Sequence, residues 1–170
     1  MKTPPHRLAT GTLLDGKWHI DGLLGEGGMG AVYSATHVRN SRKAAIKVLH
    51  SEVGEDEASR KRFLAEGYAA NRVDHPGTVQ VLDDGVTPQG QLYLVMEHLR
   101  GRSLESLAER TGGRLSLGDN LRLGAAALEV VAAAHAKGIV HRDLKPENLF
   151  FCDDGTVKVS AVDSRKSDAA

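Results

Sequence analysis

The sequence of 170 residues has one cysteine, Cys152, so the chain cannot form an internal disulfide. A single thiol is typical of a protein kept in a reducing compartment. The 22 basic and 22 acidic residues cancel, and no basic run stands out, which argues against nucleic acid or an anionic membrane as a partner. No apolar run reaches the length of a membrane span, and no signal-peptide core follows the N-terminus. These absences predict a soluble, cytoplasmic protein without a membrane partner.

Hydrophobic residues make up 41% of the chain, enough for a core in one domain of ordinary size. Alternating and helical patterns predict five strands, then helices, then a hairpin. The strands are expected at 18–24, 31–36, 43–49, 78–82 and 91–98, the helices at 56–73, 104–110 and 117–137, and the hairpin strands at 149–152 and 156–159. Residues 1–14 are expected to be a flexible leader because they contain two prolines and no periodicity.

Glycines cluster between the first two predicted strands, at Gly25, Gly27 and Gly30, two residues before Val32. A dinucleotide-binding fingerprint would need a helix after the third glycine, but a strand is predicted there. A Walker-type phosphate loop would end in Gly-Lys-Ser/Thr, which is absent. The spacing resembles the glycine-rich loop of protein kinases, in which backbone N–H groups approach phosphate oxygens. A plain glycine-rich turn is the alternative for this pattern taken alone.

Two charged residues lie in apolar surroundings further along. Lys47 is in the predicted strand 43–49, where an ammonium group is costly unless it is paired. Glu66 lies three residues after Phe63, close to the apolar face of the helix at 56–73. An edge-strand lysine and a solvated surface glutamate are the alternatives.

The most specific stretch is His-Arg-Asp-Leu-Lys-Pro-Glu-Asn at residues 141–148. It resembles the catalytic loop of the protein kinase family in the form of the bacterial-type serine/threonine branch. With this loop, the glycine pattern and the Ala-Ile-Lys ending at Lys47, the resemblance covers nearly all of residues 15–160.

The resemblance implies a role for each matching residue. Asp143 would orient the substrate hydroxyl and accept its proton, Lys145 would steady the transferred phosphoryl group, and Asn148 would hold a magnesium ion. Lys47, positioned by Glu66, would engage the inner phosphates of ATP. The remaining residues expected to contact the nucleotide are Leu24, Gly25, Glu26, Gly27, Gly28, Met29, Gly30, Val32, Ala45, Met96, Glu97, Leu99 and Leu149.

The sequence departs from the family pattern after the last predicted strand. The family places Asp-Phe-Gly after a Val-Lys-Val-x strand, but here Ala161 occupies the aspartate position and Asp163 comes two residues later. Two residues of extended chain move a side chain by about 6 to 7 Å, too far for the same metal site. The activation segment, the Ala-Pro-Glu motif and the remaining helices of the family domain do not occur within the 170 residues.

The expected fold is therefore α+β, with a kinase-like N-lobe of a five-stranded antiparallel sheet and one helix at 15–98. The first helices and the catalytic loop of an incomplete C-lobe follow at 99–162, and a polar tail at 163–170. Three interpretations stay open: a serine/threonine protein kinase that uses ATP and Mg²⁺ on a protein substrate, a pseudokinase that binds nucleotide or a partner, and a truncated product without function. The apolar faces of the helix at 117–137 also predict self-association.

Overall fold

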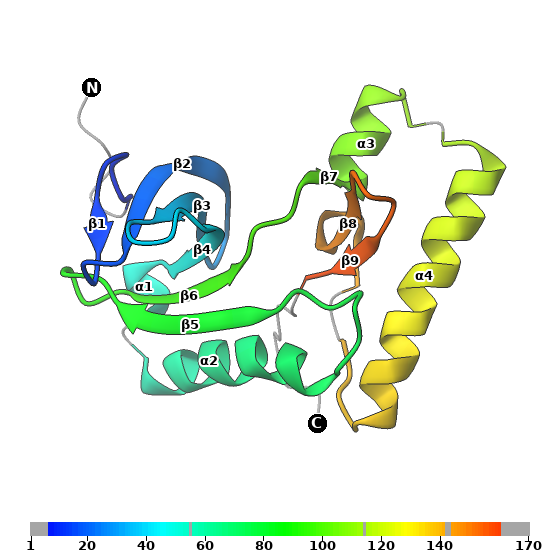
Figure 1. Ribbon diagram of the computed structural model, residues 1–170. Coiled ribbons are helices and arrows are strands. Elements are labelled where there is room, and N and C mark those ends of the chain that lie inside the picture. Colours follow the sequence, from blue (N-terminus) through cyan, green and yellow to red (C-terminus); the bar gives the residue numbers. More distant parts are fainter. Residues whose placement is uncertain (1–6, 55, 114, 142–143, 161–170) are drawn as a thin grey trace. The chain divides into compact units, whose positions relative to one another are not determined.

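Six strands between Leu13 and Glu97 pair into one antiparallel sheet (Figure 1). Their order across the sheet is β1-β2-β3-β4-β6-β5. They are β1 (Leu13–Leu14), β2 (Trp18–Gly27), β3 (Gly30–His37), β4 (Lys43–Leu49), β5 (Val81–Val86) and β6 (Leu92–Glu97). The α+β class and the antiparallel sheet are as the sequence predicts, and the two-residue β1 adds a sixth strand to the five expected.

The computed structural model describes residues 7–54, 56–113, 115–141 and 144–160. The chain divides into two units, one of Met1–Leu64 with Val81–His98 and one of Ala65–Gln80 with Leu99–Ala170. Helix α2 (Glu57–Arg72) runs from the first into the second, and the short α1 (Ser51–Gly54) precedes it.

The sheet of the first unit has an apolar core on each face, because successive side chains of a strand point to opposite faces. Tyr33, Ile46 and Val95 belong to one cluster of buried side chains. Leu49, Phe63 and Leu94 belong to the other, which includes the start of α2. The helix at 56–73 is thus confirmed, with its Phe63 stripe buried.

The second unit contains a small antiparallel sheet, in the order β7-β8-β9, and two helices. Its elements are β7 (Gly101–Ser103), α3 (Leu104–Arg110), α4 (Leu117–Ala136), the 3₁₀ turn η1 (Pro146–Asn148), β8 (Leu149–Cys152) and β9 (Val157–Val159). Ser103 caps α3 as expected, its hydroxyl accepting the N–H of Ser106 at 3.2 Å. Gly138 follows α4 at a φ of +70°, a backbone conformation that glycine adopts readily.

Two expectations about segments are wrong in part. The strand expected at 78–82 begins only at Val81, because Thr78 and Val79 pair with Val159 of the second unit instead. The expected leader includes Leu8 and Leu14, but both are buried in the first unit's core. Contacts with segments distant in the sequence decide both cases, a bridge to Val159 in the first and core packing in the second, and local patterns do not report them.

None of the helices within the described residues is long and apolar enough to cross a lipid bilayer.

Candidate functional site

The glycine-rich segment forms a β-hairpin, as predicted. Strand pairing places Gly25 opposite Val32 and Gly27 opposite Gly30. A Cβ added to Gly25, Gly27 or Gly28 would meet no atom within 4 Å, whereas one added to Gly30 would lie 2.2 Å from the carbonyl oxygen of Val48. The first three glycines therefore leave open space beside their backbone, and Gly30 allows β3 to pack against β4.

His50, directly after β4, contacts this hairpin twice. Its backbone N–H donates to the carbonyl oxygen of Met29 at 3.0 Å, and its imidazole Nε2 lies 3.0 Å from the carbonyl oxygen of Gly27. Because a carbonyl only accepts, the ring nitrogen is the donor. The register that pairs Gly30 with Leu49 brings His50 to this place.

The carboxylate of Glu26 in the same hairpin forms an ion pair with Arg7. The hydrogen bond from Arg7 is the main reason that the pKa of Glu26 is lowered, and the charge of His50 adds a smaller effect. The hairpin is thus tied to the N-terminal segment as well as to the end of β4.

One face of the sheet collects four of the predicted nucleotide-binding residues. Val32 pairs with Lys47 across β3 and β4, and Ala45 pairs with Met96 across β4 and β6. Ala45 and Lys47 are two apart on one strand, so all four side chains share a face. Residues separated by up to 64 positions in the sequence therefore meet beside the glycine hairpin.

Lys47 is half-buried, and its Nζ lies 5.9 Å from the centre of the Phe63 ring. An ammonium group over an aromatic face is a favourable arrangement. Glu66, its predicted partner, belongs to the second unit, and the pairing stays a prediction.

The other expected contacts are placed as follows. Leu24 is 56% exposed near the end of β2, and Met29 and Met96 both pack against the second apolar cluster. Glu97 ends β6 opposite Ala44, Leu99 begins the later segment of the second unit, and Leu149 of β8 pairs with Val159. Their contacts with a nucleotide stay predictions.

The loop at 141–148 belongs to the second unit. Nε2 of His141 donates to the carbonyl oxygen of Ser160 at 3.0 Å, and Lys145 lies 3.8 Å from the carboxylate of Glu147. Asp143, the expected catalytic residue, and Arg142 lie outside the described residues.

Asn148 is held by the residue that follows β9. The backbone N–H of Ser160 donates to the Asn148 carbonyl at 2.9 Å, and the Ser160 hydroxyl lies 3.3 Å from the Asn148 side-chain oxygen. Position 161, where the family has its aspartate, comes next and lies outside the described residues, as does Asp163.

The described residues do not by themselves fit a magnesium ion, which prefers several oxygen ligands including carboxylates. They contain no group of three or more His, Cys, Asp or Glu side chains able to hold a metal, and Asn148 supplies only a neutral oxygen.

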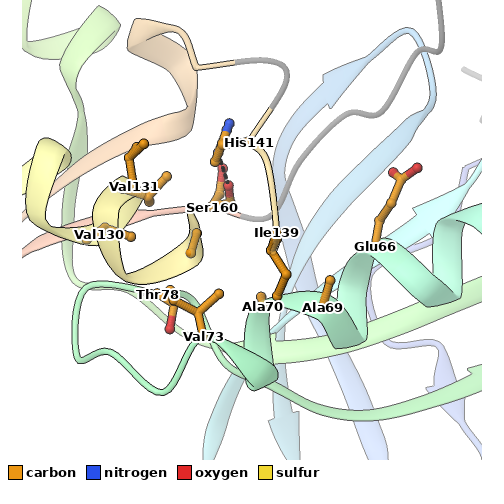
Figure 2. A pocket seen from close by; sticks show the side chains of 12 residues that line it. Glu66, Ala69, Ala70, Val73, Thr78, Val130, Val131, Ile139, His141 and Ser160 are labelled. Atoms are coloured by element: carbon orange, nitrogen blue, oxygen red, sulfur yellow. Dashed lines mark hydrogen bonds between the residues drawn. The ribbon is translucent and has the colours of Figure 1, made fainter. Parts of the chain in front are cut away.

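A small apolar cavity of about 40 Å³ lies beside the start of this loop (Figure 2). Helix α2 contributes Glu66, Val73 lies directly after that helix, and α4 contributes Val130 and Val131. The pair of His141 and Ser160 lies at its edge, where Figure 2 marks their hydrogen bond. The cavity has room for about two or three water molecules but offers them few polar partners.

Sequence reasoning missed Arg7, His50 and Ser160. None of the three belongs to a motif. His50 and Ser160 directly follow β4 and β9, Arg7 lies before β1, and each contacts a segment at least twelve positions away in the sequence. Only the position of His50 directly after a predicted strand could have drawn attention to it.

Comparisons with known proteins agree with these features. Residues 18–163 match the family model described as protein kinase domain. The chain is 36% identical to the serine/threonine-protein kinase pkn3 of Myxococcus xanthus over 149 residues, covering 88% of this chain and 27% of that protein. It is 39% identical to PknA of Mycobacterium tuberculosis over 154 residues, covering 88% of this chain and 36% of that protein.

The structure is similar to the crystal structure of the Mycobacterium tuberculosis PknI kinase domain. The TM-score is 0.75 at 30% identity, and the match covers 91% of this chain and 61% of that one. The chain thus spans about a quarter to a third of the length of these curated relatives.

Proposed function

Because this chain belongs to the protein kinase family, we propose that its first unit binds ATP. Its second unit then carries the residues that act on the serine or threonine hydroxyl of a protein substrate and on the transferred phosphoryl group. The supporting observation is the shared sheet face of Val32, Lys47, Ala45 and Met96 beside a hairpin whose glycines leave open space. Apolar side chains suit an adenine ring, and a lysine ammonium beside a glycine backbone that a phosphate can approach closely suits phosphates. The proposed partners are ATP, a protein acceptor and a second copy of the chain.

In the proposed reaction, a serine or threonine hydroxyl oxygen forms a bond to the terminal phosphorus of ATP. The bond from that phosphorus to the bridging oxygen breaks, and ADP leaves. Asp143 takes the hydroxyl proton, and Lys145 offsets negative charge on the transferred group. If magnesium binds, it would supply further charge neutralisation, and Asn148 would be its proposed ligand among this chain's described residues.

A second candidate is nucleotide binding without transfer. Alanine at position 161, directly after the Ser160 that contacts Asn148, favours this alternative, because the carboxylate expected there is replaced by a methyl group.

Two measurements separate the candidates. A thermal shift with ATP, with and without magnesium, tests binding, and no shift in either condition would exclude both. Transfer from labelled ATP to a general acceptor protein, compared with Asp143→Asn, then tests catalysis. Signal in the wild type and none in Asp143→Asn supports the kinase; binding without signal supports the second candidate.

A further inference from the structure

The glycine hairpin carries one charged side chain, the carboxylate of Glu26, among residues 25–30. Glu26 pairs with Ala31, which belongs to the first core cluster, whereas its neighbour Gly25 pairs with Val32 on the proposed nucleotide face. Because successive residues of a strand face opposite sides, the carboxylate lies on the other side of the hairpin from the proposed phosphates. One strand layer, about 10 Å or less, separates the two. An uncompensated carboxylate at that distance would repel a phosphate group.

The side chain of Arg7 supplies the compensating charge. Its guanidinium forms a hydrogen-bonded ion pair with the carboxylate of Glu26. The next residue fixes this segment on the sheet, because the side chain of Leu8 is buried in the first core cluster and its backbone N–H donates to the hydroxyl of Tyr33 at 3.1 Å. The core cluster that contains Ala31 therefore also holds the segment that brings Arg7 to the hairpin.

His50 is the other basic side chain printed beside this carboxylate. Its Nε2 lies 3.9 Å from Oε1 of Glu26, but the same nitrogen donates to the carbonyl oxygen of Gly27 at 3.0 Å. That hydrogen bond forms whether the imidazole is neutral or charged, whereas a guanidinium is charged at every pH at which proteins stay folded. Arg7 is therefore the permanent cation beside Glu26.

We infer that Arg7 sets the affinity of the hairpin for phosphate groups by neutralising Glu26. The inference rests on the proposed ATP site and extends it to a residue outside the glycine pattern. Arg7 acts through Glu26, so it is a positioning residue and not a catalytic one. Its effect should grow with the charge of the ligand, from adenosine, which has no phosphate, through AMP and ADP to ATP. A residue that only supports the fold would affect all four ligands equally.

The first test measures the Kd of the 170-residue chain for these four ligands by calorimetric titration without magnesium. Arg7→Ala is expected to raise the Kd for ATP about three- to fivefold at low ionic strength, with smaller changes for ADP and AMP and none for adenosine. Arg7→Lys, which keeps the charge, should stay close to the wild type. Because Arg7 and Glu26 are 39% and 31% exposed, about 0.5 M salt should abolish the difference. An equal change for all four ligands, or no change for ATP, would overturn the inference.

The second test asks whether Arg7 acts through Glu26. Glu26→Gln is expected to bind ATP at least as tightly as the wild type, and the double variant with Arg7→Ala to bind like Glu26→Gln alone, because no carboxylate is left to neutralise. Arg39→Ala is the control for net charge, since Arg39 is exposed beyond the far end of β3 from the hairpin. A double variant as weak as Arg7→Ala would show direct action on the phosphates and overturn the inference. A wild type that binds none of the four ligands would instead refute the proposed ATP site itself.

Discussion

The imidazole Nε2 of His50 lies 3.0 Å from the carbonyl oxygen of Gly27, so a residue after β4 holds the backbone of the hairpin between β2 and β3. The N–H of His50 also donates to the carbonyl of Met29. These two hydrogen bonds, to Gly27 at the end of β2 and to Met29 in the turn, restrict the movement of the hairpin. A restricted loop loses less entropy when it binds phosphate.

Replacing His50 with alanine is expected to weaken ATP binding about three- to tenfold, because the hairpin loses one anchor. His50→Gln is expected to keep most of the affinity, since a glutamine amide can donate the same hydrogen bond. Calorimetric titration with ATP measures both. Equal affinity of His50→Ala and the wild type would mean that this contact does not position the hairpin.

Two glycines of the hairpin are expected to respond differently to alanine. The new Cβ of Gly30→Ala would lie 2.2 Å from the Val48 carbonyl, so β3 and β4 must separate. We expect a loss of about 2 kcal/mol or more in the free energy of unfolding. Gly28→Ala meets no atom within 4 Å and is expected to keep the wild-type melting temperature while lowering ATP affinity. A calorimetric melt of both variants checks this, and equal melting temperatures would contradict it.

The carboxylate of Asp21 is expected to make stability depend on pH. Burial acts to raise its pKa, but hydrogen bonds from Thr36, Lys43 and His19 together outweigh burial and lower it. A lowered folded-state pKa means that the ionised form favours the folded state. This stabilisation is complete above the unfolded-state pKa, about 3.9, and is lost as pH falls through the lower folded-state value.

Urea unfolding at pH 6 and at pH 3 tests this effect in the wild type and Asp21→Asn. The difference between the two in free energy of unfolding should be larger at pH 6 than at pH 3. Lys43→Met, which removes one donor, should reduce the pH 6 difference. A difference that is the same at both pH values would show that ionisation of Asp21 is not its source.

Gly77 packs against Val130 of α4, so substitutions at these two positions are expected to have non-additive effects on the free energy of unfolding. A Cβ at Gly77 would lie 2.3 Å from the Cγ2 methyl of Val130 and 3.1 Å from the Val157 carbonyl. Gly77→Ala is therefore expected to destabilise the chain by about 1 to 3 kcal/mol. In the double variant with Val130→Ala, the new methyl group can occupy the space vacated, so the combined loss should be smaller than the sum of the single losses. Additive losses in urea unfolding would contradict direct contact.

Much of the fold follows from local signals in the sequence. β4 and α3 have the predicted bounds, and α2, α4 and the β8–β9 hairpin lie within one residue of theirs. The signals are the apolar run after Lys43 in β4, the Ser103 cap of α3 and the glycine after α4, and each of them acts through neighbours in the chain. Segments 78–80 and 8–14 were misjudged for a different reason each. Thr78 pairs with Val159, and Leu8 and Leu14 are buried in a core that strands as far along the chain as β6 complete.

The candidate site shows the same division. The resemblance to the family's motifs singled out the glycine hairpin, Lys47 and residues 141–148 as site residues. The anchoring of the hairpin by His50 and Arg7 and of Asn148 by Ser160 depends on strand register and chain reversal. No pattern of consecutive residues encodes such contacts.

Helix α4 shows most clearly which features follow from the sequence and which depend on the tertiary structure. The sequence by itself determined that 117–136 is helical and apolar on more than one side, and even the periodic stripe through Leu121 and Leu128 indicates this. Only the tertiary structure decided which stripe is buried, since Leu123, Ala127 and Val130 pack inward and the leucines remain exposed. The physical reason is that burial depends on the shape of the surface opposite the helix, which other segments supply, whereas helical periodicity depends only on the chain itself.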